Sequence, residues 1–150
     1  MKTKAEIYER SNSIETVDLS RFAKSYYKKL LNASETKTDR QKAASSLVDY
    51  LCNKYKINGV QVVVTDKKRP QRRERRSKVT FLGFYVPGTK TIIVYNKTAV
   101  KSQTVAIKTF IDVLLHEFIH HYDYEYLKLG RSYHTAGFYK RISDLKNKLL

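Results

Sequence analysis

The segment VAIKTFIDVLLHEFIHHYDYEYLKLG, residues 105–130, decides the fold because it predicts one long, buried helix. Apolar residues recur in it at steps of three and four, and no proline interrupts the pattern. Ser102 or Thr104 is expected to cap its start, and Gly130 is placed to end it. The apolar positions are Val105, Ile107, Phe110, Ile111, Leu114, Leu115, Phe118 and Ile119.

This helix carries the motif His116-Glu117-Phe118-Ile119-His120, an HExxH pattern. Residues four apart on a helix are neighbours, so both imidazoles can bind one metal ion. Glu117 would then lie beside the open coordination position. The alternative is a helix that carries two histidines by chance, because a bare HExxH is a short pattern.

A catalytic zinc usually takes three protein ligands and keeps the fourth position for water. Helical phase turns His121 about 100° from His120, so that it is expected to pack elsewhere. Glu125 is also turned away from the pair. The histidines and carboxylates that follow the motif are His121, Asp123, Glu125, His134 and Asp144, and the last of these falls late in a charged terminal helix.

Asp123 and His134 remain after this elimination. Asp123 lies one turn past His120, which suits either a hydrogen-bond acceptor for an imidazole N–H or a solvated helix charge. His134 follows the turn signal of residues 129–133, so the chain can fold back and present its ring to the metal. Thr135 is expected to cap the final helix. His134 is therefore the favoured third ligand.

The stretch HEFIHHYDYEYLKLGRSYHTAGFYKRI, residues 116–142, resembles the active-site region of SprT-like metalloproteases, the group that includes Spartan. In that family a third zinc histidine follows the HExxH helix, with an aromatic residue four places beyond it. The corresponding residues here are His134 and Phe138, although Thr135 stands where many members have glycine. The resemblance implies that His116, His120 and His134 hold one catalytic Zn²⁺ and that Glu117 is the general base.

Composition predicts a single cytoplasmic catalytic domain over residues 1–150. The length suits one domain, and 41% hydrophobic residues suffice for a modest core. Cys52 is the sole cysteine, which excludes a disulfide framework and a cysteine-rich zinc ribbon, and it is expected to be buried. The sequence has neither an apolar run of membrane-spanning length nor the apolar core of a signal peptide. A monomer is favoured, without being determined by the sequence.

Net charge points to a polyanionic partner. The chain has 30 Lys and Arg against 14 Asp and Glu, a formal charge of +16. The densest part is a loop or hairpin tip at about residues 66–78, which we expect to be flexible and to bind DNA phosphates with little sequence preference. The alternative is a solubilising loop. Its basic residues are Lys67, Lys68, Arg69, Arg72, Arg73, Arg75, Arg76 and Lys78.

The remaining pattern predicts an α+β, small zincin-like domain with three strands in a mainly antiparallel sheet. Two N-terminal helices are expected at about residues 18–31 and 39–55. Strands are expected at residues 60–65, 79–86 and 91–96, with the last two joined as a hairpin through Pro87 and Gly88. The HExxH helix and a C-terminal helix complete the domain.

Together these patterns predict a zinc endopeptidase acting on DNA-bound or DNA-crosslinked proteins, with the DNA association implied by both the resemblance and the charge. One alternative is a small HExxH protease that cleaves a specific regulator, such as a repressor. Another, from a different class, is a nucleic-acid-binding module without catalysis. Stimulation of proteolysis by DNA separates the first two, and zinc content separates both from the third.

Overall fold

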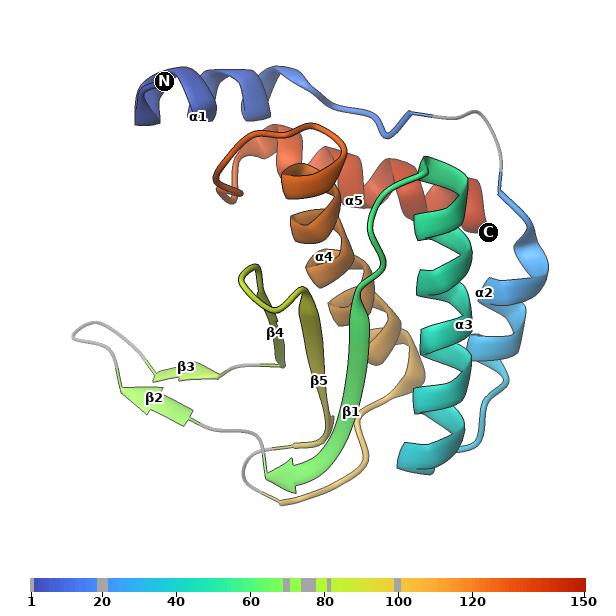
Figure 1. Cartoon of the computed structure of the whole chain (residues 1–150). Helices are drawn as coiled ribbons and strands as arrows, with labels where there is room; N and C mark the ends of the chain where they lie inside the picture. The colour runs from blue at the N-terminus through green and yellow to red at the C-terminus, as the bar shows by residue number, and fades with distance from the viewer. Residues whose placement is uncertain (1, 19–21, 69–70, 74–77, 81, 99–100) are drawn as a thin grey trace.

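The computed structural model describes residues 2–18, 22–68, 71–73, 78–80, 82–98 and 101–150, with the backbone alone described for 68, 71–73 and 78–80. Five helices and five strands lie within these ranges (Figure 1). The helices are α1 (Lys4–Ser13), α2 (Lys24–Leu31), α3 (Lys37–Tyr55), α4 (Ile107–Glu125) and α5 (Ala136–Leu149). The strands are β1 (Gln61–Lys68), β2 (Gln71–Arg73), β3 (Lys78–Thr80), β4 (Gly83–Val86) and β5 (Thr91–Lys97).

The main sheet has the strand order β1-β5-β4. β4 and β5 form the expected antiparallel hairpin, with Val86 paired to Thr91 across the turn that contains Pro87. β1, however, pairs with β5 in parallel, from Gln61 opposite Thr91 onward. The expectation of a mainly antiparallel sheet is therefore wrong, because one of the two pairings is parallel and the sheet is mixed. The α+β class is confirmed.

Helices α3 and α4 pack on the sheet and bury one of its faces. In β5 every second residue, starting at Ile92, is buried, which is the period expected when only one face meets a core. α4 supplies much of that core through its buried apolar residues. The core members from α4 are Phe110, Ile111, Leu114, Leu115, Phe118, Ile119 and Tyr122, so the helix carrying HExxH is anchored along its length.

Several helix boundaries differ from the predicted ones, and α4 ends at Glu125 instead of continuing to Gly130. α1 was not expected at all, and α2 begins at Lys24 rather than near residue 18. α4 begins at Ile107 after Ala106, which provides no side-chain cap. Neither Ser102 nor Thr104 caps it, because Thr104 instead forms a β-bridge with Lys97. At α5 the predicted cap is confirmed, since the Thr135 hydroxyl accepts a hydrogen bond from the amide of Phe138.

The basic segment contains a short antiparallel ribbon, in which Gln71 to Arg73 of β2 pair with Thr80 to Lys78 of β3. Figure 1 shows this ribbon projecting away from the helices, and residues 69–70 and 74–77 of the predicted basic loop lie outside the described residues. The predicted strand over residues 79–86 is divided between β3 and β4. No helix in the described part of the chain is long and apolar enough to cross a membrane.

Candidate metal centre

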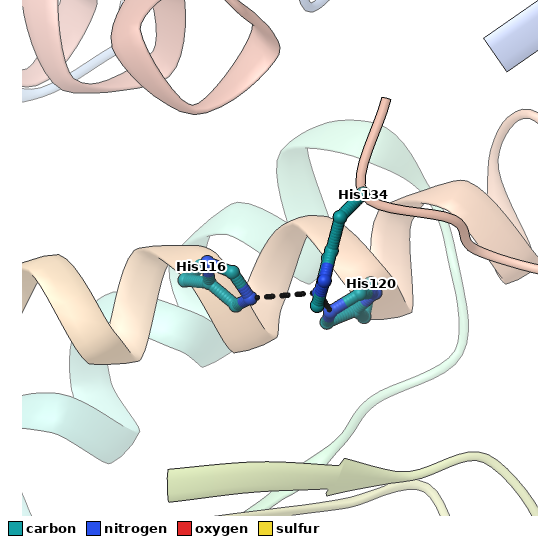
Figure 2. Close-up of side chains that lie close together, drawn as sticks. All are labelled: His116, His120 and His134. Atoms are coloured by element: carbon teal, nitrogen blue, oxygen red, sulfur yellow. Dashed lines mark hydrogen bonds between the residues drawn. The ribbon is translucent and has the colours of Figure 1, made fainter. Parts of the chain in front are cut away.

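Three histidine rings meet at the surface of α4 (Figure 2). His116 and His120 project from adjacent turns of the helix, and His134 reaches them from the segment before α5. Nε2 of His134 lies 3.2 Å from Nε2 of His116 and 3.0 Å from Nε2 of His120. The ligand atoms offered by the three side chains all lie within 4.8 Å of one another.

These separations fit a tetrahedral metal ion. Two nitrogens that each lie about 2.05 Å from a tetrahedral zinc are separated by about 3.3 Å. The measured 3.0 and 3.2 Å are close to that value, so a small adjustment of ring positions would accommodate the ion. The three histidines are therefore close enough to bind one metal ion.

Burial keeps the imidazoles in the neutral form that binds metals. It lowers the pKa of His116 to about 4, with a smaller contribution from His134. It lowers the pKa of His120 to about 3, with His116, His134 and Arg141 adding to the effect. Burial also lowers the pKa of His134. Protons therefore compete weakly for these nitrogen lone pairs at neutral pH.

Glu117 lies beside the three rings, with its Oε1 3.8 Å from Nε2 of His116. Glu117 is only 6% exposed, and burial raises the pKa of its carboxyl group to about 7. A carboxylate with a pKa near neutrality can both accept and return a proton. The side chain is thus suited to general acid and base chemistry next to a metal.

A cleft of about 700 Å³ opens onto the three histidines. One wall is the histidine-bearing face of α4, and the other includes residues of β4 and the segment just before it. Much of the lining is apolar, and Glu117 and the histidines supply polar groups to it. The residues contributed by the β4 side are Leu82, Gly83, Phe84, Tyr85 and Pro87.

Ser132 fixes the tautomer of His120. Its hydroxyl lies 2.7 Å from Nδ1 of His120 and donates its hydrogen to Oδ2 of Asp123, also at 2.7 Å. A serine hydroxyl has a single hydrogen, so toward His120 it accepts. Nδ1 of His120 therefore carries the proton, and Nε2 presents its lone pair to the centre of the cluster.

Asp123 is in turn paired with Arg141, whose Nη2 lies 2.9 Å from Oδ2 with both side chains fully buried. Burial raises the pKa of Asp123, while the guanidinium and the Ser132 hydroxyl act in the opposite direction. Arg141 keeps its charge in a protein, and a buried cation needs an ionised partner. Asp123 interacts with His120 through the Ser132 hydroxyl and does not bond the imidazole directly.

Phe138 closes the cluster from the side of α5. Its ring centroid lies 5.0, 4.6 and 5.2 Å from those of His116, His120 and His134. Phe138 is fully buried, so it holds all three rings against one apolar surface. The sequence singled this residue out through the family resemblance alone.

The other candidates for the third ligand lie elsewhere. His121 is buried, where its Nδ1 lies 2.8 Å from the hydroxyl of Tyr85 and its Nε2 lies 2.7 Å from the carbonyl of Asn58. Glu125 accepts a hydrogen bond from Asn58. Asp144 pairs with Lys148. This geometry agrees with the sequence argument that set aside His121, Glu125 and Asp144 and favoured His134 as the third ligand.

The basic residues predicted to bind nucleic acid are only partly described. Lys67 is exposed on β1. Arg69, Arg75 and Arg76 lie outside the described residues, and only the backbone is described for Lys68, Arg72, Arg73 and Lys78.

Sequence reasoning missed the roles of Ser132 and Arg141. Arg141 counts toward the basic surplus, yet it is fully buried. Helical spacing gives a signal that could have found it, because Phe138 and Arg141 are three residues apart and so share one face of α5. Ser132 lies in the turn before His134, where no periodic pattern marks it.

The chain gives no match to protein-family models, to curated proteins or to solved structures. Its function is therefore inferred from its own residues and their geometry.

Proposed function

We propose that this chain is a zinc-dependent endopeptidase of the SprT-like, zincin type, and that it acts on proteins bound or crosslinked to DNA. The observation that carries this proposal is the convergence of three histidine Nε2 atoms beside a buried glutamate in the lining of a cleft. Three neutral imidazoles with one open position form the ligand set of a catalytic zinc site. Structural zinc sites, in contrast, are closed by four protein ligands.

His116, His120 and His134 would hold the ion. Bound zinc would supply a Lewis acid that polarises a peptide carbonyl and acidifies a water molecule. Glu117 accepts the proton of the attacking water and passes it to the departing amine, a role that its pKa of about 7 favours. Ser132 and Asp123 keep His120 in the tautomer that the ion requires.

A peptide substrate would lie in the cleft as an extended strand. β4 pairs with β5 on one side and ends the described sheet on the other, so its second edge is available for backbone hydrogen bonds. Gly83, Phe84 and Tyr85 of this strand line the cleft opposite the histidines. Pairing along this edge would present a scissile peptide bond to Glu117.

The positive charge of the chain supports the proposal that it acts on proteins bound to DNA. A surplus of 16 positive charges draws the protein to polyanions. The β2–β3 ribbon carries the densest basic run, and a single residue separates Thr80 at its end from Leu82 at the start of the cleft lining. DNA held by this ribbon would bring a bound protein near the cleft. A basic surface of this kind reads phosphates and not base sequence.

The test compares the wild-type chain with Glu117→Gln on a basic DNA-binding protein, with and without DNA. We expect wild-type cleavage that DNA stimulates and added salt suppresses. Glu117→Gln should still bind one zinc and lose cleavage by at least about 100-fold, because general-base catalysis is worth this much. Full activity in Glu117→Gln would overturn the role of Glu117. Cleavage indifferent to DNA would favour a protease for a specific regulator.

A further inference from the structure

Helix α1 lies across the start of α5 and the segment that carries His134 (Figure 1). Ser11 is its only buried residue among Lys4–Ser13, so α1 adds almost nothing to the hydrophobic core. Its contacts are instead polar and aromatic, and they gather around His134. We propose that α1 is the element that positions His134 for metal binding. This proposal rests on the zinc site proposed above.

The residue before His134 is held by the first half of α1. The ring of Tyr133 lies 6.2 Å from that of Tyr8, centroid to centroid, in a tilted arrangement. The ammonium group of Lys4 lies 5.7 Å from the centroid of the Tyr133 ring. Both separations are within the range of attractive aromatic and cation–π contacts.

The residue after His134 is held by the end of α1. The hydroxyls of Ser11 and Thr135 lie 3.0 Å apart, and both residues are fully buried. Thr135 also caps α5, so one side chain joins the two helices. The amide of Gly137 donates to Oδ1 of Asn12 at 3.2 Å. His134 is thus fastened to α1 at both of its chain neighbours.

Arg141 extends this hold to a second histidine. Its Nη1 donates to the carbonyls of Ser11 and Ile14 at 2.6 Å each, while its Nη2 bonds Asp123. Asp123 accepts from Ser132, whose hydroxyl in turn accepts from His120. The end of α1 is therefore linked through hydrogen bonds to the environment of His120 as well as to that of His134.

Gly137 offers a direct test of this arrangement. A Cβ at this position would lie 2.4 Å from the carbonyl oxygen of Ser11 and 2.6 Å from that of Asn12, both backbone atoms that cannot rotate away. Alanine favours a helix more than glycine does, so Gly137→Ala displaces α1 without weakening α5 itself. Gly59→Ala is the matched control, because a Cβ there meets nothing within 4 Å.

The measurement is zinc affinity of the full chain by competition with a chelator of known affinity. We expect Gly137→Ala to lower the affinity at least tenfold, toward that of His134→Ala, and Gly59→Ala to stay within twofold of wild type. In the His134→Ala background, Gly137→Ala should cause a much smaller loss than in the wild-type background, because only the link through Arg141 to His120 remains to be disturbed. An equal loss in both backgrounds would overturn the proposal, because α1 would then act on the fold in general and not through His134.

Cobalt(II) bound in place of zinc gives an independent spectroscopic signature. A four-coordinate site with three histidines absorbs visible light more strongly than a six-coordinate site with two. We expect Gly137→Ala to weaken the cobalt bands as His134→Ala does. Bands of wild-type intensity in Gly137→Ala would contradict the proposed role of α1.

Tyr8 provides a milder variant should Gly137→Ala fail to fold. Tyr8 is 47% exposed, so Tyr8→Ala leaves the core intact. We expect Tyr8→Ala to weaken zinc binding about threefold and Tyr8→Phe, which keeps the ring against Tyr133, to restore it. Equal affinity in Tyr8→Ala and wild type would overturn the contribution of this contact.

The two proposals fail in different ways. If the wild-type chain binds zinc and both Gly137→Ala and Tyr8→Ala bind it equally well, only the role of α1 is lost. If the wild-type chain binds no zinc, the proposed function and the role of α1 are both refuted.

Discussion

The hydroxyl of Ser132 accepts a hydrogen bond from Nδ1 of His120 across 2.7 Å. This bond aims the Nε2 lone pair of His120 at the other two histidines and makes the ring a stronger base. Ser132 comes from the turn before α5 and His120 from α4, so the bond also ties the loop of the third histidine to the helix of the first two.

Replacing Ser132 with alanine should therefore weaken metal binding. We expect Ser132→Ala to lower zinc affinity about 10- to 100-fold, the usual effect of removing a hydrogen-bond partner of a ligating histidine. Competition titration measures this loss. Ser46→Ala is a suitable control, because Ser46 is exposed on α3 and bonds only its own helix. Equal affinities in the two variants would show that Ser132 does not orient His120.

The buried pair of Arg141 and Asp123 should matter for stability. Arg141→Met leaves a carboxylate without its partner in a fully buried position, which we expect to cost about 3–5 kcal/mol of unfolding free energy. The neighbouring Lys140→Met breaks an ion pair with Glu15 whose side chains are 59% and 55% exposed, so its cost should be about 1 kcal/mol or less. Urea denaturation of the metal-free proteins compares the two. Similar losses would contradict the assigned importance of the buried pair.

The sequence predicts best where a periodic apolar pattern coincides with burial. α4 has that pattern, and both its position and the convergence of His116, His120 and His134 agree with expectation. α1 was missed because its sequence, KAEIYERSNS, buries only Ser11 and has no apolar stripe to detect.

Pairing and polar contacts escape such patterns because they depend on distant parts of the chain. β1 lies parallel to β5 and packs against α3, while α4 packs against β5, and strand composition does not encode this arrangement. The link from Arg141 through Asp123 and Ser132 to His120 joins polar side chains from three segments. Ser132 and Arg141, considered alone, look like ordinary surface residues.

Cys52 should be protected from alkylation in the folded protein. It is 3% exposed, and burial raises the pKa of its thiol to about 12. Only the thiolate reacts, so at pH 8 we expect labelling about 1,000-fold slower than in the unfolded chain, whose thiol has a pKa of about 8.5. Iodoacetamide labelling with and without denaturant measures the ratio. Rapid labelling of the folded protein would show that Cys52 is accessible.

The basic ribbon should control binding to nucleic acid. Replacing Arg72 and Arg73 with glutamine removes two charges, which we expect to reduce the slope of log affinity against log salt for duplex DNA by up to about 2. Fluorescence anisotropy at several salt concentrations measures that slope. Lys54→Gln with Lys56→Gln, at the end of α3, removes the same charge from another surface and serves as the control. Equal slopes in the two double variants would argue against a special role for the ribbon.

The most direct test of the account is the zinc content of the purified full chain after dialysis against zinc-free buffer. The account predicts one zinc per wild-type chain, one per Glu117→Gln chain, and little retained zinc in His116→Ala, His120→Ala or His134→Ala. A wild-type chain that holds no stoichiometric zinc, and whose thermal unfolding is unchanged by a chelator, would contradict the metal centre and the proposed protease with it.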